Sequence, residues 1–127
     1  MSFGNCGYAF PTVIGAKVAA PKRPAVSYAG DGAWGMSMGE TMTCVRENIP
    51  MTAVVFNNGQ WGAEKKNQVD FYNRRFVAGE LENPSFAAIA RAMGAEGVTV
   101  DSLDDVGAAL SDAVHAQMND QKTTIVE

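Results

Sequence analysis

Two short apolar runs, at residues 25–29 and 51–56, have the length and composition of buried strands. Between them, residues 37–47 form a stretch without proline in which Met38 and Met42 recur at helical spacing. We therefore expect a strand, an amphipathic helix whose methionines face the core, and a second strand. Such a unit normally makes a right-handed crossover between two parallel strands.

The second half of the chain continues the same alternation. We expect Asn83 to cap a helix, and a short strand to follow at residues 98–100. Another helix would begin at Ser102 or Asp104 and lead to a strand at residues 123–126. This order predicts one α/β domain, a doubly wound and mostly parallel sheet with helices on both faces.

Composition and charge narrow the possible functions. The 127 residues are 46% hydrophobic and 19% charged, which is ordinary for one globular domain. The net charge of −4, with no basic cluster longer than a pair, argues against a nucleic-acid partner. The chain has no signal-peptide pattern and no apolar run near the roughly 18 residues of a membrane helix, so we expect no membrane partner. Cys6 and Cys44 lack metal-site spacing and fit a reduced, cytoplasmic setting.

Polar residues follow both predicted strands where each strand ends. Asp31 follows the first strand, flanked by Gly30 and Gly32, and Asn58 follows the second. The carboxyl ends of neighbouring parallel strands share one rim of a sheet, so these two side chains can meet there. A carboxylate and an amide oxygen suit Mg²⁺, which commonly completes its shell with phosphate oxygens. Gly30, Gly32 and Ala33 are small enough to let the backbone approach a phosphate.

Each motif also has an ordinary structural interpretation. Gly-Asp-Gly is common in turns, and the Asn58-Gly59 pair favours a hairpin turn. Taken singly, each is more typical of structure than of function. The two together, separated by the 24 residues 33–56 and each at the end of an apolar run, favour a site for a metal and a phosphorylated ligand.

This pair of motifs resembles the signature of the thiamine diphosphate enzymes. Residues 4–11 and 14–17 are also similar to the segment that precedes the signature in the acetolactate synthase group. The resemblance implies thiamine diphosphate and Mg²⁺ as cofactors, with metal ligands from the Asp31 and Asn58 side chains and the Gln60 carbonyl. Cys6 stands where acetolactate synthases carry a larger Met, which sets this chain apart from that group. The cofactor-binding residues it implies are Gly4, Asn5, Cys6, Gly30, Gly32, Ala33, Trp34 and Gly62.

A second segment, residues 57–76, closely resembles the sulfoacetaldehyde acetyltransferase family. The resemblance implies cleavage of sulfoacetaldehyde and transfer of its two-carbon unit to phosphate, which gives sulfite and acetyl phosphate. Because both substrates are anions, Lys65, Lys66, Arg74 and Arg75 are candidate ligands for sulfonate or phosphate. The alternative for these four residues is a solvated basic face.

The resemblance further implies that the chemistry needs residues outside this chain. In the family, a Glu from another domain, usually of the partner subunit, activates the cofactor, and no residue here matches it. His115, the only histidine, is expected to be a surface or packing residue. We therefore expect residues 1–127 to be a C-terminal domain of a longer, homo-oligomeric enzyme with active sites between subunits.

Two other functions remain open at this stage. The chain could belong to another thiamine diphosphate carboligase or decarboxylase that acts on a 2-oxo acid, such as acetolactate synthase. It could also be a non-catalytic module for cofactor binding or dimerisation. Product identity separates the first alternative from the acetyltransferase.

Overall fold

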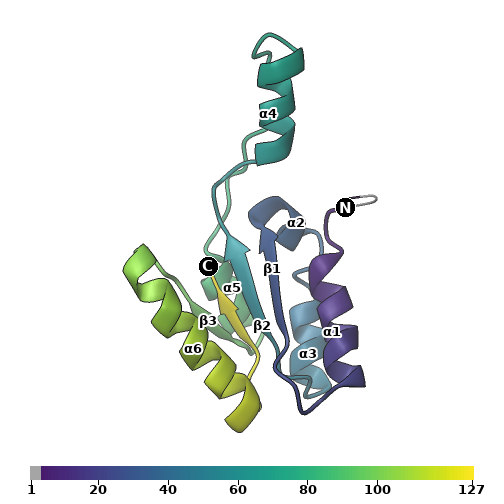
Figure 1. Cartoon of the computed structure of the whole chain (residues 1–127), viewed down its shortest axis with the longest axis vertical. Coiled ribbons are helices and arrows are strands. Elements are labelled where there is room, and N and C mark those ends of the chain that lie inside the picture. Colours follow the sequence, from purple (N-terminus) through teal and green to yellow (C-terminus); the bar gives the residue numbers. More distant parts are fainter. Residues whose placement is uncertain (1–3) are drawn as a thin grey trace.

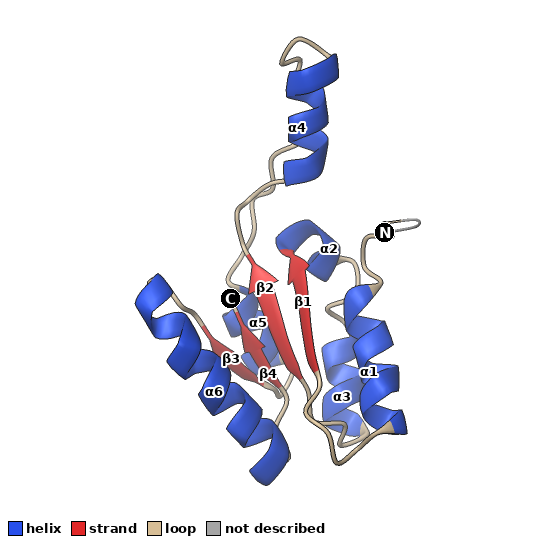
Figure 2. Ribbon diagram, in the orientation of Figure 1, coloured by secondary structure: helices blue, strands red, loops and turns tan. Residues whose placement is uncertain are grey.

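The chain folds around a parallel sheet, shown in a computed structural model that describes residues 4–127 (Figures 1 and 2). The sheet has four strands in the order β1-β2-β4-β3, all parallel. Val26 of β1 pairs with Thr52 of β2, which pairs in turn with Thr124 of β4. The strands are β1 (Val26–Gly30), β2 (Thr52–Phe56), β3 (Glu96–Val98) and β4 (Thr124–Val126). The predicted α/β fold with a parallel sheet is therefore confirmed.

Helices cover both faces of this sheet. In Figure 1, α6 lies in front of the strands and α5 lies behind them. The three residues of β4 are all buried, as expected of a strand with both faces covered. The helices are α1 (Ala9–Ala19), α2 (Asp31–Gly35), α3 (Glu40–Arg46), α4 (Gly62–Phe71), α5 (Phe86–Ala92) and α6 (Leu103–Asn119).

The hydrophobic core joins the sheet to the first helices. The ring of Phe10 in α1 packs against the indole of Trp34 in α2, with centroids 4.6 Å apart. This contact seats α2 directly beyond the end of β1, so the core fixes the position of the Gly-Asp-Gly segment. The buried apolar cluster comprises Phe10, Trp34, Cys44, Met51, Ala53, Val55, Phe86, Ala90 and Ile125.

Two sequence-based expectations about the helices are wrong. Met42 is 52% exposed, whereas Thr41 and Cys44 of the same helix are buried. The buried face of α3 is thus displaced from the methionine stripe, although Met38 does pack against the core. Asn83 does not cap α5. Ser85 takes that role, because it directly precedes the first helical residue and accepts a hydrogen bond from the Ala88 amide at 3.1 Å.

The boundaries of the later elements differ by small shifts. The strand expected at residues 98–100 lies at Glu96–Val98, since it starts directly after the turn at Gly94, whose φ is 87°. Ser102 caps α6 and accepts from the Asp104 amide at 3.2 Å. The last strand begins at Thr124 rather than one residue earlier.

One face of β1 is open, although the sequence predicts a buried strand. Tyr28 is 71% exposed, and Val26 and Phe56 are exposed as well. The rings of Tyr28 and Phe56 meet edge to face with centroids 6.5 Å apart. β1 is an edge strand, and no described helix covers these side chains. The result is an exposed apolar surface on the sheet.

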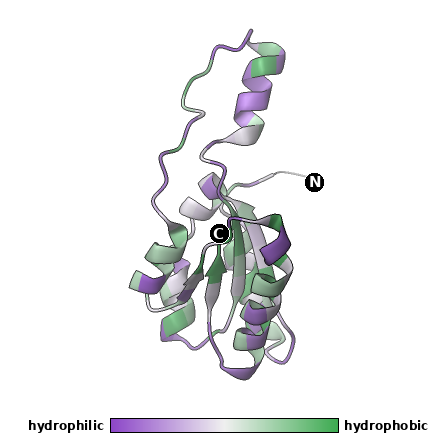
Figure 3. Ribbon diagram, turned by 90° about the vertical axis from the view of Figure 1, so that its left-hand side faces the viewer, coloured by the Kyte–Doolittle hydropathy of each residue, from purple (hydrophilic) through white to green (hydrophobic). Residues whose placement is uncertain are grey.

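Helix α4 projects away from the rest of the domain (Figure 1). None of its residues is buried, and most of it is hydrophilic in Figure 3. We call residues 61–80, which contain α4 and the segment that returns from it, the α4 arm. The arm is attached at its base by two backbone hydrogen bonds, from the Trp61 amide to Gly79 at 2.9 Å and from the Leu81 amide to Gly59 at 2.8 Å.

Candidate metal and diphosphate site

The candidate site lies at the rim of the sheet where β1 and β2 end. Gly30 is the last residue of β1, and Asp31 is the first residue of α2. β2 ends at Phe56, directly before the Asn57-Asn58-Gly59 turn. The register pairs Gly30 with Phe56, so both motifs leave the sheet at the same level. The structure thus brings together the two motifs, as their spacing predicts.

Asp31 is the best-fixed side chain at this rim. It is only 2% exposed. Its Oδ1 accepts a hydrogen bond from the Gly32 amide at 2.9 Å, and its Oδ2 accepts one from the Gly59 amide at 2.8 Å. Gly59 has a φ of 66°, a left-handed conformation that favours glycine. The bond to Gly59 therefore ties the end of β1 to the turn that carries Asn58.

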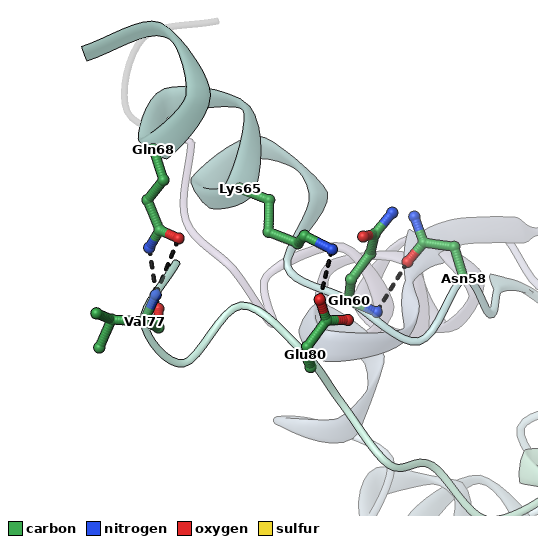
Figure 4. Close-up of polar contacts among 6 residues, drawn as sticks. All are labelled: Asn58, Gln60, Lys65, Gln68, Val77 and Glu80. Atoms are coloured by element: carbon green, nitrogen blue, oxygen red, sulfur yellow. Dashed lines mark hydrogen bonds and ion pairs between the residues drawn. The ribbon is translucent and has the colours of Figure 1, made fainter. Parts of the chain in front are cut away.

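Asn58 and Gln60 form the second half of the rim. The Oδ1 atom of Asn58 accepts a hydrogen bond from the Gln60 amide at 3.2 Å (Figure 4). This local turn holds the amide oxygen of Asn58, which remains exposed, beside the exit of β2. The backbone of Gln60 also pairs with Glu80 in an antiparallel bridge. The position of the Gln60 carbonyl is therefore set by the base of the α4 arm.

The donor set at this rim fits Mg²⁺. Within residues 4–127, no three His, Cys, Asp or Glu side chains gather into a self-sufficient metal site. One buried carboxylate, one amide oxygen and one backbone carbonyl are instead hard donors that leave most of an octahedral shell to other oxygens. Such a partial set suits a cation that is shared with a phosphorylated ligand.

The two glycines beside Asp31 differ in their surroundings. A Cβ atom added to Gly30 would meet no atom within 4 Å, so the space beside this backbone is open to a ligand. A Cβ atom on Gly32 would lie 2.8 Å from Cζ2 of Trp61. Gly32 is thus required by the packing of the Trp61 ring, a reason for glycine that the sequence alone does not reveal.

The remaining predicted cofactor residues fall into two groups. Trp34 is 2% exposed and its ring lies in the core, so only its backbone can face a ligand at this rim. Ala33 is half-buried beside it. Gly62 begins α4, and a Cβ there would lie 3.6 Å from the amide nitrogen of Asn58. Gly4, Asn5 and Cys6 form an exposed segment ahead of α1, and Gly4 has a φ of 75°.

The four basic residues predicted to bind substrate lie on the α4 arm and not at the Asp31 rim. Lys65 pairs with Glu80 at 2.6 Å (Figure 4), and its ammonium also lies 5.6 Å from the centre of the Phe76 ring. Lys66 pairs with Asp70 at 2.6 Å. Arg74 and Arg75 are exposed at the far end of the arm.

The far end of the arm is held by side-chain contacts of its own. The Gln68 amide donates to the Val77 carbonyl at 2.9 Å and accepts from the Val77 amide at 3.2 Å (Figure 4). Asn73 and Arg74 have φ values of 52° and 59°, which reverse the chain after α4. The arm is thus a defined hairpin-like unit, although it contacts little of the domain.

Asn83 also belongs to the rim, although the sequence alone does not predict it there. The side-chain amide of Asn83 donates to Oδ2 of Asp31 at 2.7 Å and to Oδ1 of Asn57 at 2.9 Å. The Asn83-Pro84 pair ahead of a helix is the only local signal at this position, and it is more typical of a helix cap. Asn83 joins the rim from a segment 52 residues after Asp31, a separation that periodicity cannot bridge.

A further carboxylate, Glu127, follows β4 and stabilises the start of α5. It accepts hydrogen bonds from the Ser85 hydroxyl and the Phe86 amide, both at 2.6 Å, and from the Thr99 hydroxyl at 3.1 Å. Burial raises the pKa of the Glu127 carboxyl, but these hydrogen bonds outweigh burial and hold the pKa below its usual value.

No described helix is both long and apolar enough to cross a membrane.

Known proteins share much of this sequence. The family model described as "Thiamine pyrophosphate enzyme, C-terminal TPP binding domain" matches residues 1–127. The chain is 80% identical over its full length to a sulfoacetaldehyde acetyltransferase of Castellaniella defragrans, and 72% identical to one of Alcaligenes xylosoxydans xylosoxydans. It covers 21% of the length of each relative.

A solved structure shows the same fold. Rhodococcus jostii RHA1 thiamine diphosphate-dependent 4-hydroxybenzoylformate decarboxylase matches with a TM-score of 0.86 and 23% sequence identity. The match covers 95% of this chain and 22% of that one. The match of the family model over residues 1–127 shows that the chain belongs to the thiamine pyrophosphate enzymes, as a C-terminal TPP-binding domain.

Proposed function

We propose that this chain supplies the diphosphate- and Mg²⁺-binding half of the active site of a sulfoacetaldehyde acetyltransferase. The observation that carries the proposal is the buried carboxylate of Asp31, which directly follows β1 and accepts a hydrogen bond from the backbone amide of Gly59, beside Asn58. Two relatives, 80% and 72% identical to this chain, are sulfoacetaldehyde acetyltransferases, which suggests the substrate. The reaction would convert sulfoacetaldehyde and phosphate into acetyl phosphate and sulfite.

In this proposal, different rim residues bind Mg²⁺ and the diphosphate. Asp31 and Asn58 hold Mg²⁺ through side-chain oxygens, and Gln60 holds it through its backbone carbonyl. The open space beside Gly30 accommodates the diphosphate, and the backbone of α2 lines it. Bound thiamine diphosphate supplies the carbanion chemistry, while the protein binds and orients it. The other cofactor contacts would come from Gly4, Asn5, Cys6, Gly32, Ala33, Trp34 and Gly62.

The ion pairs on the α4 arm distinguish the four candidate substrate ligands from one another. Glu80 and Asp70 already neutralise Lys65 and Lys66 in this structure. Arg74 and Arg75 lie beyond these pairs and offer planar forks that suit sulfonate and phosphate oxygens. We therefore assign substrate binding first to the two arginines, with the lysines as positioning residues of the arm.

The exposed apolar residues support a larger assembly. On the arm, Phe71 and Val77 are more than 70% exposed, and on the sheet Tyr28 is comparably exposed. Exposed apolar patches of this kind are typical of interfaces. We propose that the rest of the polypeptide or a second subunit covers them, in a homo-oligomer whose active sites lie between subunits. The carboxylate that activates the cofactor would come from outside residues 1–127.

The decisive experiment measures the products of the full-length protein that carries this sequence. It receives sulfoacetaldehyde, phosphate, Mg²⁺ and thiamine diphosphate, and the release of sulfite and acetyl phosphate is followed. Asp31→Ala should abolish both products, because it removes the buried metal ligand. Asp112→Ala, which removes an exposed carboxylate from α6, is the matched control and should leave the rate unchanged.

The alternatives predict different products. A parallel reaction with pyruvate alone should yield no acetolactate. Acetolactate without sulfite would support the 2-oxo acid carboligase and overturn the proposed substrate, while leaving the cofactor site in place. Cofactor binding without any product from either substrate would favour a non-catalytic module.

A further inference from the structure

Asn83 connects the two halves of the rim, because its side chain contacts both Asp31 and Asn57. Its side-chain nitrogen lies 2.7 Å from Oδ2 of Asp31 and 2.9 Å from Oδ1 of Asn57. A carboxylate only accepts hydrogen bonds, so the nitrogen of the Asn83 amide must be the atom that faces Asp31. One amide group thus joins the residues that follow β1 and β2.

The hydrogen bonds of Asp31 leave it one direction for a metal ion. A carboxylate offers about four lone-pair positions, two on each oxygen. Oδ2 uses both of its positions, on the amide of Gly59 and the side chain of Asn83. Oδ1 uses one, on the amide of Gly32. The free position is therefore on Oδ1.

We propose that Asn83 is a positioning residue of the metal site. By occupying Oδ2 it holds the Asp31 carboxylate in one orientation and leaves Oδ1 as the only atom that binds the cation. Its second bond, to Asn57, fixes Asn83 itself to the end of β2. This inference rests on the proposed function, because it assumes that Asp31 is a ligand of Mg²⁺.

The expected effect follows from the chemistry of metal sites. Groups that hydrogen-bond a ligating carboxylate orient it, and their removal typically weakens metal binding by about 10- to 100-fold. Asn83→Ala should fall in this range, since it frees Oδ2 to rotate and to compete with Oδ1. Asn83→Leu keeps approximately the same side-chain shape and should weaken binding similarly, which separates the lost hydrogen bond from a lost contact.

The test uses the full-length protein with thiamine diphosphate and no substrate. Mn²⁺ serves as the probe, and its binding is followed by the loss of the free-ion electron paramagnetic resonance signal. We expect the dissociation constant of both Asn83 variants to rise at least 10-fold. Ser85→Ala is the matched control: it removes the cap of α5 two residues away, so it should lower the unfolding temperature and leave Mn²⁺ affinity unchanged.

Each outcome decides between the two proposals. Absence of Mn²⁺ binding by the unmodified protein, or equal binding by Asp31→Ala, would overturn the proposed metal site itself. Normal binding by the unmodified protein together with unchanged binding by both Asn83 variants would overturn only the role of Asn83. If the Asn83 variants do not fold, Asn57→Ala replaces them. It removes the anchor of Asn83 and should weaken Mn²⁺ binding, and unchanged affinity would again overturn the inference.

Discussion

The two glycines of the Gly-Asp-Gly segment should respond in opposite ways to replacement by alanine. A Cβ atom at Gly32 would lie 2.8 to 2.9 Å from three atoms of the Trp61 ring, well inside normal carbon contact. A Cβ atom at Gly30 would meet no atom within 4 Å. Gly30 also has a φ of −70° and a ψ of 159°, which alanine adopts without strain. The first change tests packing, and the second tests the space reserved for the cofactor.

The structure gives the magnitudes of both effects on the cofactor-free protein. Overpacking at Gly32 should cost about 1–3 kcal/mol. The better helix propensity of alanine offsets at most about 1 kcal/mol of that, which leaves a net loss of about 1 kcal/mol at the middle of the range. Gly30→Ala should be neutral or stabilise by up to about 1 kcal/mol, because it restricts the unfolded chain.

Cofactor binding should show the reverse order. If the diphosphate lies over Gly30, a methyl group there should raise the dissociation constant of thiamine diphosphate by at least about tenfold, or about 1.4 kcal/mol. Urea unfolding of the cofactor-free full-length protein, followed by tryptophan fluorescence, measures stability. Titration with thiamine diphosphate at saturating Mg²⁺ measures binding.

Two results would refute this reasoning. Equal stability of Gly32→Ala and the unmodified protein would mean that Trp61 does not restrict position 32. Unchanged cofactor affinity of Gly30→Ala would mean that the open space beside Gly30 is not where the diphosphate binds. Because the two measurements are independent, either half of the prediction can fail alone.

Three further predictions concern the scaffold. The pKa of Glu127 is lowered in the folded state. The carboxylate therefore stabilises the fold fully above its unfolded pKa of about 4.3, and this stabilisation is lost as the pH falls through the lower folded pKa. Glu127→Gln should abolish this acid dependence of the unfolding free energy. Burial, with a smaller contribution from a nearby carboxylate, raises the pKa of the Cys44 thiol to about 11, so iodoacetamide at pH 8 should label the exposed Cys6 and spare Cys44, as mass spectrometry would show. Gly97→Ala should destabilise by about 3 kcal/mol because its Cβ would strike the backbone of α5, whereas Gly107→Ala in open space on α6 should stabilise by up to about 1 kcal/mol in the same urea titration.

The sequence predicts the rim well because its determinants are local. Asp31 and Asn58 each follow an apolar run, and parallel strands joined by a short crossover must end side by side. The order of strands and helices follows from the same runs. These features need only the spacing of apolar residues and the turn chemistry at their ends, both of which can be read from neighbouring residues.

The features that the sequence did not predict depend on contacts between distant segments. Met42 and Cys44 are both apolar, and only the packing of α3 against the sheet decides which is buried. Gln117 of α6 is fully buried because its amide pairs with the backbone of Ala25, 92 residues earlier. Lys17 is buried against α6: its ammonium donates to the nearby carbonyls of Pro21 and Arg23 and also to Sδ of Met118, 101 residues later, and burial lowers its pKa. A polar residue of this kind looks like a surface residue until its partners are known.

The α4 arm and the metal ligands are connected through the same few residues. The arm begins two residues after Gly59, whose amide donates to Oδ2 of Asp31, and it ends three residues before Asn83, whose side chain donates to the same oxygen. The hydrogen bonds across the base of the arm, including that from the Leu81 amide to Gly59, keep these two donors at a fixed separation. Because both donors form hydrogen bonds with one oxygen of a buried carboxylate, a partner that binds the arm would contact a segment whose two ends are linked to Asp31.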